Sequence, residues 1–354
     1  MSNSSSVNSL TWSAILPDEF IVYFAFWFGV VASNCLTALG MLSNLINITV
    51  FVKLGLKERV NFTLFWLSTT DLVLAVFHAA MTRGFIGDAE LGPISVDGTA
   101  FINFLWIIKA LCKDLSSGLT MFISIERCLC VIRPIHFHSS FIARHGKLIV
   151  TVILVFFITY YSPLVFSFSF VKDTNSTLFY ETWTDFYIEY DRFNYYFLGF
   201  FLCVFAPFLV LVCSVLMFRG LQQSSRVRRA LAIEHQIDHS HSGSVMTTKE
   251  RRVVKMVFVL AILYMITSFP LIAALVIYDY FDTFYSEANL IETRNLILLT
   301  EMVTFYIGTS YGSFSILVYY YFNANFRTQF RIIFSFTLFK MRQEKSLCTD
   351  RSVT

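Results

Sequence analysis

Charged residues are scarce in this chain. Only 14% of its 354 residues are Asp, Glu, Lys or Arg, whereas 56% are hydrophobic, and the mean hydropathy is +0.63. A soluble domain of this composition would expose far too much apolar surface to water. The composition therefore indicates an integral membrane protein, and the net charge of +3 gives no sign of nucleic-acid binding.

Motifs for metal binding and catalysis are also scarce. The seven cysteines form no CxxC pair and no Cys/His zinc pattern, and most of them lie within or beside apolar segments. Such cysteines are usually small buried residues. The apolar segments contain no HExxH motif and no pair of catalytic aspartates. We therefore expect no bound zinc, and we do not expect an enzyme.

Long apolar segments are abundant instead. About 20 apolar residues span the hydrocarbon of a bilayer as a helix, and seven segments reach that length. The sequence thus predicts an all-α membrane protein, namely a seven-transmembrane helix bundle. The segments lie at about 22–52, 60–82, 100–132, 147–170, 193–218, 253–278 and 296–322.

A short amphipathic eighth helix is expected after the seventh segment. Phe326, Phe330 and Phe334 fall on one face with arginines beside it, a pattern typical of a helix that lies on a membrane surface. The chain then divides into an N-terminus, a seven-transmembrane domain, the surface helix and a tail. Their predicted limits are 1–21, 22–322, 323–338 and 339–354.

Lysine and arginine are unevenly distributed among the connections. With the N-terminus outside, most of them fall on the cytoplasmic side, as the positive-inside rule requires. We therefore expect a multi-pass plasma-membrane protein with an extracellular N-terminus and a cytoplasmic tail. In this orientation the sequons at Asn3 and Asn175 lie outside, where they can be glycosylated. The predicted outer segments hold only Arg83, Lys172, Arg192 and Arg294.

The third apolar segment carries charges in its interior. A charged side chain at the centre of a bilayer costs about 2.5–3.5 kcal/mol, so it should face protein or water and carry function. Polar residues recur along residues 101–134 at helical spacing, which predicts one polar stripe along a helix face. A stripe that joins the two sides of a membrane suggests communication between them. Its members are Lys109, Lys113, Ser116, Thr120 and Arg127.

The triplet Glu126-Arg127-Cys128 stands at the inner end of the third segment. Together with several other residues at suitable spacing, it makes the chain resemble a rhodopsin-like (class A) G protein-coupled receptor, a family that has an acid-Arg-aromatic triplet at this place. The resemblance covers about residues 24–336 and looks most like divergent invertebrate, especially molluscan, chemosensory or neuropeptide receptors. The other matching positions are Asn44, Asp71, Ser116, the helix-bend prolines Pro207 and Pro270, and Tyr319.

The chain also departs from the family pattern. Ser268 replaces the usual sixth-segment tryptophan, and Ser315-Ile316 replaces the asparagine-proline pair before Tyr319. Ile102 stands where the family usually has a cysteine that is linked to the second outer loop. We therefore expect the outer end of the third helix to be held by packing and charge alone.

The resemblance implies an activation switch at the inner side. Arg127 would pair with Glu126 and Glu250 at rest and turn to a G protein on activation, with Tyr319 in the same switch. The alternative is that Glu250 only joins a solvated cluster with the neighbouring Lys249 and other cations.

The resemblance also implies a polar network at mid-depth, formed by Asn44, Asp71, Ser116 and Ser315. A buried carboxylate needs a cation or a proton. The network would therefore hold either a sodium ion or hydrogen bonds alone, and the sequence leaves both open.

A ligand pocket is implied at the outer side, around Trp106, Lys109, Lys113, Glu301 and Tyr306. Amine receptors of the family carry an aspartate at the position of Lys109, so a simple cationic amine is not expected. One hypothesis is that the lysines bind an anionic group. The alternative is that Lys109 pairs with Glu301.

These features together indicate a receptor for an extracellular chemical or peptide ligand. Its implied partners are a heterotrimeric G protein, arrestin, a receptor kinase and membrane lipid. The sequence does not decide between a chemosensory and a neuropeptide receptor. A transporter or lipid scramblase that uses the same polar stripe is the alternative outside this class.

Overall fold

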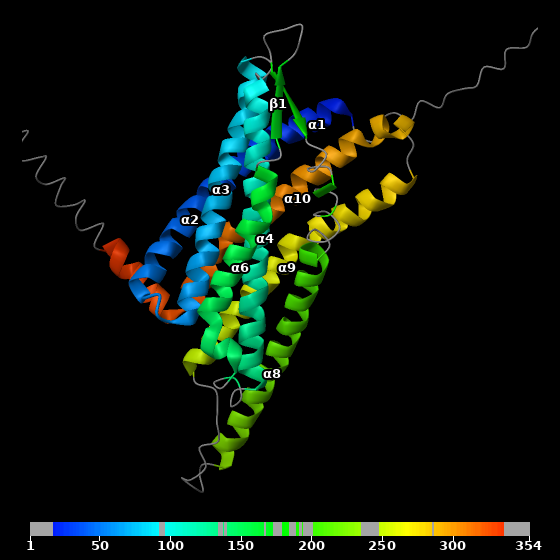
Figure 1. Ribbon diagram of the computed structural model, residues 1–354. Coiled ribbons are helices and arrows are strands. Elements are labelled where there is room, and N and C mark those ends of the chain that lie inside the picture. The colour runs from blue at the N-terminus through cyan, green and yellow to red at the C-terminus, as the bar shows by residue number, and fades with distance from the viewer. Residues whose placement is uncertain are drawn as a thin grey trace, which may run out of the picture.

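The computed structural model is a bundle of long helices (Figure 1). Its first rod has three consecutive parts, α1 (Asp18–Phe24), the π-helix η1 (Ala25–Ala32) and α2 (Ser33–Leu54). The predicted all-α seven-helix bundle is confirmed. The other six rods are α3 (Arg59–Leu91), α4 (Val96–Ile132), α6 (Phe141–Val165), η3 with α8 (Phe201–Phe205 and Ala206–Glu234), α9 (Thr248–Phe284) and α10 (Glu287–Phe322).

Most of the chain is described by the structure, apart from the two termini and several connections. The described residues are 17–91, 96–133, 137, 140–165, 168–172, 179–183, 189–190, 193, 201–234, 248–284 and 287–335.

Six helical stretches of this described part are long and apolar enough to cross a membrane. The last rod, α10, is not among them although it has 36 residues. Its second half, residues 305–322, contains many Ser, Thr, Tyr and Gly residues, which score low in hydropathy. Thr304, Tyr311, Ser313 and Ser315 are nevertheless buried, because α10 turns these side chains toward the other helices.

Several helices extend beyond the predicted apolar segments. The fifth segment was expected to end at 218, but α8 continues to Glu234. The sixth was expected to begin at 253, but α9 begins at Thr248. A helix satisfies its backbone hydrogen bonds internally, so it does not have to end where the sequence becomes polar. The limits of the apolar segments therefore do not mark the ends of these helices.

A β-hairpin follows α6. Its strands β1 (Phe168–Lys172) and β2 (Phe179–Trp183) are antiparallel, with Phe168 opposite Trp183. The fourth apolar segment was expected to reach residue 170, which was wrong, because α6 ends at Val165 and β1 begins soon afterwards. The aromatic and β-branched sequence FSFV is apolar, but it is also typical of a strand.

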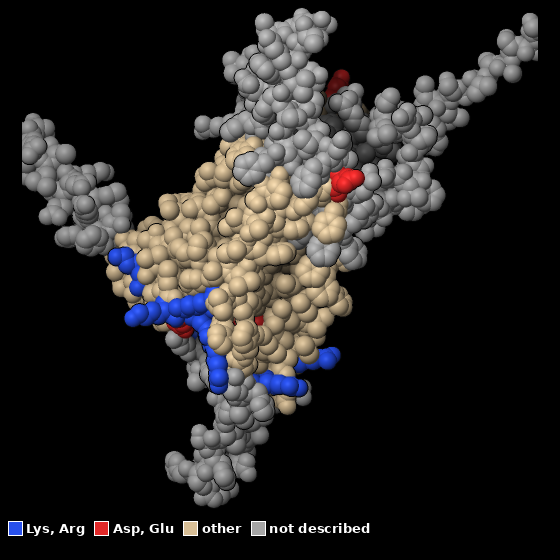
Figure 2. Space-filling view, viewed as in Figure 1, with Lys and Arg blue, Asp and Glu red and all other residues tan. Residues whose placement is uncertain are grey.

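The two ends of the bundle differ in charge. Figures 1 and 2 share one view, and lysines and arginines gather at the end opposite the hairpin. We call the two ends the hairpin end, marked by β1 and β2, and the basic end. The basic end is marked by Lys53, Lys57, Arg133, Arg144, Arg219, Arg252 and Lys255.

The helix α4 lies at the centre of the bundle and packs against α3, α6, α8 and α9. Its approach to α8 is close at Gly220, where an added Cβ would lie 2.3 Å from Val131 Cγ1. Small residues let helix backbones approach each other in membrane proteins. Because α4 contacts so many neighbours, its polar residues can meet partners on several helices.

A further helix covers residues 324–335 after α10. The backbone N–H of Phe326 donates to Asn323 Oδ1 at 3.1 Å, which caps the start of this helix. Phe326 is fully buried and packs against the rings of Phe51 and Tyr319. The helix is thus attached to the basic end of the bundle.

Candidate functional site

The polar stripe of α4 faces the interior of the bundle. Lys109, Ser116, Thr120 and Arg127 are buried, and Lys113 is half-buried. These residues are spread along α4 from Lys109 to Arg127, so each meets a different part of the neighbouring helices. The stripe therefore divides into a level near the hairpin end, a mid-depth level and a level near the basic end.

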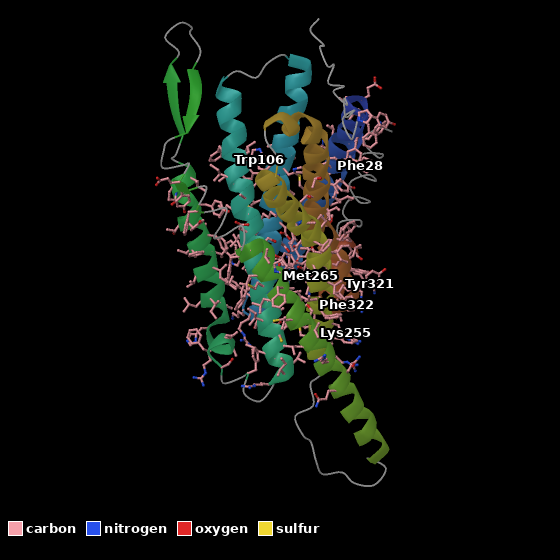
Figure 3. All side chains as sticks on the ribbon, turned by 90° about the vertical axis from the view of Figure 1, so that its right-hand side faces the viewer. Phe28, Trp106, Lys255, Met265, Tyr321 and Phe322 are labelled. Carbon is pink, nitrogen blue, oxygen red and sulfur yellow. The ribbon has the colours of Figure 1, made fainter. Side chains whose placement is uncertain are left out.

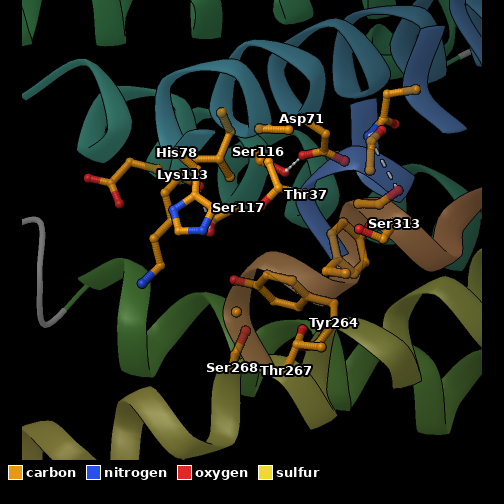
Figure 4. A pocket seen from close by; sticks show the side chains of 18 of the residues that line it. Thr37, Asp71, His78, Lys113, Ser116, Ser117, Tyr264, Thr267, Ser268 and Ser313 are labelled. Atoms are coloured by element: carbon orange, nitrogen blue, oxygen red, sulfur yellow. Dashed lines mark hydrogen bonds between the residues drawn. The ribbon is translucent and has the colours of Figure 1, made fainter. Parts of the chain in front are cut away.

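A cavity of about 70 Å³ lies beside the stripe (Figure 4). In this view Lys113 and Asp71 lie on opposite sides of its lining. Two small residues, Ser268 and Gly308, line this cavity, and an added Cβ on Gly308 would meet nothing within 4 Å. The polar lining includes Asp71, His78, Lys113, Asp114, Ser116, Ser117, Tyr264, Thr267, Ser268, Thr304 and Tyr311.

Lys109 and Trp106 form a separate contact nearer the hairpin end, where Figure 3 labels Trp106. The Lys109 Nζ lies over the Trp106 ring, 4.1 Å from its centroid, within the range of a cation–π interaction. Lys109 is buried but does not line the cavity. Tyr306 packs edge-on against Phe28 and does not line it either. Of the predicted pocket residues with described side chains, only Lys113 faces the cavity.

Asp71 and Ser116 meet at mid-depth. The Ser116 hydroxyl donates to Asp71 Oδ1 at 2.7 Å and so joins α4 to α3. Thr120, one helical turn further along α4, shares a hydrogen bond of 3.3 Å with the Tyr311 hydroxyl of α10. All four side chains are buried. Hydroxyl groups therefore connect α4 to two neighbouring helices at this level.

Asn44 and Ser315 lie beside this level but bind other partners. The Asn44 amide donates to the Gly312 carbonyl at 3.3 Å, and the Asn47 amide donates to Ser315 Oγ at 3.2 Å. An added Cβ on Gly312 would lie 3.1 Å from Asp71 Cβ and 3.2 Å from Asn44 Nδ2, so glycine permits this approach. The four predicted network residues thus surround Gly312 in two separate hydrogen-bonded groups.

Glu126 and Arg127 form an ion pair near the basic end of α4. Arg127 Nη2 donates to Glu126 Oε1 at 2.7 Å, and both residues are buried. Arg59 of α3 places its Nη1 3.6 Å from the same oxygen. The structure therefore brings Arg127 and Glu126 together and adds a second cation. Their role as a switch stays a prediction.

Tyr319 and the two prolines occupy positions that shape the helices. Tyr319 is fully buried, with its ring 5.2 Å from that of Phe51. Pro207 is the second residue of α8, directly after the π-helix η3. Pro270 lies inside α9, and its carbonyl accepts a hydrogen bond of 3.5 Å from Thr304 of α10. This contact joins α9 to α10 beside the cavity.

Four of the predicted site residues lie outside what the structure describes. The predicted glycosylation sites Asn3 and Asn175 fall outside the described residues. The backbones of Glu250 and Glu301 belong to α9 and α10, but their side chains are not among the described ones. The proposed pairs Glu250–Arg127 and Glu301–Lys109 therefore stay predictions.

Three polar contacts were not anticipated from the sequence. The Tyr161 hydroxyl of α6 donates to Asp114, Ser33 Oγ lies 2.6 Å from His78 Nε2, and Arg59 meets Glu126. Of these contacts, only that of Asp114 has a sign in the sequence, because a carboxylate within an apolar segment needs a partner. Nothing in the sequence identifies Tyr161 as that partner, since the two lie on different helices.

Residues 308–312 read GTSYG and formally match the GxSxG pattern of serine hydrolases. That pattern needs a strand-to-helix turn that exposes the serine. Here the five residues lie inside α10, and the Ser310 hydroxyl donates to the Ile307 carbonyl of the same helix at 2.6 Å. These five residues therefore form part of a helix and not the turn that carries the nucleophilic serine of a hydrolase.

Comparison with known families gives one result. The family described as 7 transmembrane receptor (rhodopsin family) matches residues 42–310, which is more than half of the chain. This range contains the Asp71–Ser116 pair, the Glu126–Arg127 pair and most of the residues that line the cavity. No curated protein matches the chain.

Replacing Ser116 with alanine tests the mid-depth level. The buried Asp71 carboxylate would lose a donor, so we expect the free energy of unfolding to fall by about 1–3 kcal/mol. Ser117→Ala is the matched control, because its hydroxyl donates only to the Lys113 carbonyl of its own helix, at 3.0 Å. The measurement is thermal unfolding of the purified protein. An equal fall for both variants would contradict the role of Ser116 as the donor to Asp71.

Proposed function

The chain belongs to the rhodopsin family of seven-transmembrane receptors, and on this premise we propose that it couples an extracellular ligand to a heterotrimeric G protein. The single observation that carries the proposal is the division of the α4 stripe into levels. Lys113 lines the cavity, Ser116 binds Asp71, and Arg127 binds Glu126 near the basic end. One rigid helix thus connects a cavity to a buried ion pair.

The ligand that best fits the cavity is a small polar molecule with an anionic group. Lys113 brings an ammonium group to a lining rich in hydroxyls, and no ion pair of Lys113 occurs among the described side chains. Binding to an anion would form charge-assisted hydrogen bonds, which are among the stronger polar contacts. A volume of about 70 Å³ suits a compact group better than a whole peptide.

The basic end is the proposed cytoplasmic side, in a plasma membrane with the N-terminus outside. Exposed cations such as Arg252 and Lys255 mark this end, in agreement with the positive-inside rule. The ligand would act by binding the active conformation more tightly than the resting one. Arrestin and a receptor kinase are further partners that this function implies at the same end.

The function is tested in cells that express the protein with a promiscuous G protein and a calcium reporter. We expect small organic anions to elicit signals that their neutral isosteres do not. Substrate flux into proteoliposomes without any G protein response would instead support a transporter.

Within this assay, Lys113→Gln should weaken an active anion. Losing one charge-assisted hydrogen bond removes about 1.5–3 kcal/mol, which corresponds to roughly a 10- to 100-fold loss of potency. Lys109→Gln is the matched comparison, because Lys109 does not line the cavity, and we expect a much smaller change. Surface expression is measured for each variant. A larger effect at Lys109 than at Lys113 would overturn the assignment.

The mid-depth level also suits a sodium ion. Asp71 and Ser116 offer a carboxylate and a hydroxyl oxygen beside the cavity, and no described cation forms an ion pair with Asp71. Oxygen atoms are the ligands that hard cations prefer. When bound, the ion would supply a positive charge next to the carboxylate.

Sodium binding predicts a higher melting temperature in sodium chloride than in potassium chloride of equal ionic strength. A sodium concentration ten times the dissociation constant stabilises the folded state by roughly 1.4 kcal/mol. Asp71→Asn should abolish the difference. Glu58→Gln makes the same charge change at the basic end and should preserve it. No difference between the salts for the unmodified protein would contradict sodium binding.

Glu250 is proposed to hold Arg127 at rest together with Glu126. Glu250→Ala should then raise ligand-independent signalling, by about tenfold if the pair contributes 1.4 kcal/mol to the resting state. Lys249→Ala, at the neighbouring position, is the control. Unchanged basal signalling at equal surface expression would leave Glu250 as part of a solvated cluster.

A further inference from the structure

Arg59, at the start of α3, contacts three parts of the basic end at once. Its Nη1 donates to the backbone carbonyls of Ile142 and Ala143 in the first turn of α6. Its guanidinium also lies over the Phe137 ring, 5.5 Å from the centroid, and Phe137 is buried. The third contact is the ion pair with Glu126 at 3.6 Å. Arg59 therefore joins α3 to α4, to the first turn of α6 and to Phe137 between them.

The start of α6 is shaped to receive this side chain. His145 has non-helical angles (φ −115°, ψ 19°), so the helix is kinked one turn from the carbonyls that Arg59 binds. Carbonyls near such a kink need partners from outside the helix. Gly146 follows, and an added Cβ there would lie 3.3 Å from Arg59 Cδ. The kink and the glycine together leave the carbonyls and the space that Arg59 uses.

Glu126 presents one oxygen to both arginines. Arg127 Nη2 is 2.7 Å and Arg59 Nη1 is 3.6 Å from Oε1, whereas Oε2 is buried and has no hydrogen-bond partner among the described atoms. The Glu126 side chain is 1% exposed, so water does not replace a lost partner there. The two cations thus share a single buried acceptor.

The contact between Arg59 and Glu126 becomes important when Arg127 moves. A buried carboxylate that loses its only cation is strongly destabilised, because its desolvation is no longer compensated. With Arg59 beside Oε1, Glu126 keeps a positive partner after Arg127 leaves. Arg59 is also held by α6 and Phe137, so it does not depend on Arg127 for its position.

We infer that Arg59 is a positioning residue of the Arg127 switch, which takes over the charge of Glu126 when Arg127 turns away. The inference rests on the proposed function at one point only, because that function supplies the reason for Arg127 to move. It names Arg59 as a determinant of how easily the resting ion pair opens. Removing its charge would make Glu126 depend on Arg127 alone and would hold the switch closed.

The inference is tested first without any ligand or G protein, by thermal unfolding of the purified full chain. Arg127→Gln imitates the departure of Arg127. Arg59→Gln should lower the melting temperature roughly twice as much in that background as in the unmodified protein, since the two residues share one partner. Arg59→Lys should restore part of the loss in the Arg127→Gln background, because it keeps the charge.

Glu126→Gln provides the control background for this comparison. With no carboxylate present, Arg59→Gln should cost only its contacts with α6 and Phe137, and Arg59→Lys should give no charge-dependent rescue. An equal effect of Arg59→Gln in the unmodified and Arg127→Gln backgrounds would overturn the inference and leave Arg59 as a loop anchor.

A second readout separates positioning from anchoring. The measurement is ligand-independent nucleotide exchange on the heterotrimer that responds in the cell assay, at matched amounts of folded protein. Arg59→Gln should lower exchange severalfold and Arg59→Lys should restore it, whereas an increase with Arg59→Gln would overturn the inference. If no heterotrimer responds to the unmodified protein, the proposed function fails, while the unfolding comparison still decides the role of Arg59.

Discussion

A charged side chain buried among apolar helices needs a partner, and this requirement determines how α4 is embedded in the bundle. The helix carries Lys109, Asp114, Glu126 and Arg127 at positions that are buried or half-buried. Each of them finds its partner differently: an aromatic ring for Lys109, a tyrosine hydroxyl for Asp114 and an ion pair for Glu126. Tyr161 belongs to α6, and Arg59, the second cation beside Glu126, belongs to α3, so satisfying these charges also joins α4 to two of its neighbours.

The three levels of the stripe differ in how completely their polar groups are satisfied. At mid-depth, Ser116, Thr120 and Tyr311 are matched by neighbouring oxygens. Near the basic end, two arginines meet one carboxylate, so positive charge is in excess. Beside the cavity, Lys113 has a lining of hydroxyls and no described ion pair. The polar groups of α4 are therefore satisfied most completely at mid-depth, whereas each end keeps a charge without a matched partner of its own among the described residues.

The distribution of small residues supports the same arrangement. Gly312 allows α10 to approach Asp71 and Asn44, and Gly220 allows α8 to approach Val131 of α4. In the hairpin half, Ser268 and Gly308 have the opposite effect and leave space for the cavity. Ser268 of α9 is a small side chain in a cavity that is also lined by residues of α2, α3, α4 and α10.

The sequence alone determined the membrane class, the seven helices and the polar stripe, because hydropathy and helical spacing depend only on neighbouring residues. It also placed Asp71 and Ser116 in one network and Glu126 beside Arg127. It did not indicate that Lys109 stacks on Trp106 while Lys113 faces the cavity, although the two lysines are one turn apart. Nor did it identify Tyr161 for Asp114 or Arg59 for Glu126. Tyr161 and Arg59 lie on other helices than their partners, and the surroundings of each lysine depend on the helices packed against α4, so only the packing angles and rotations of the folded bundle decided these contacts.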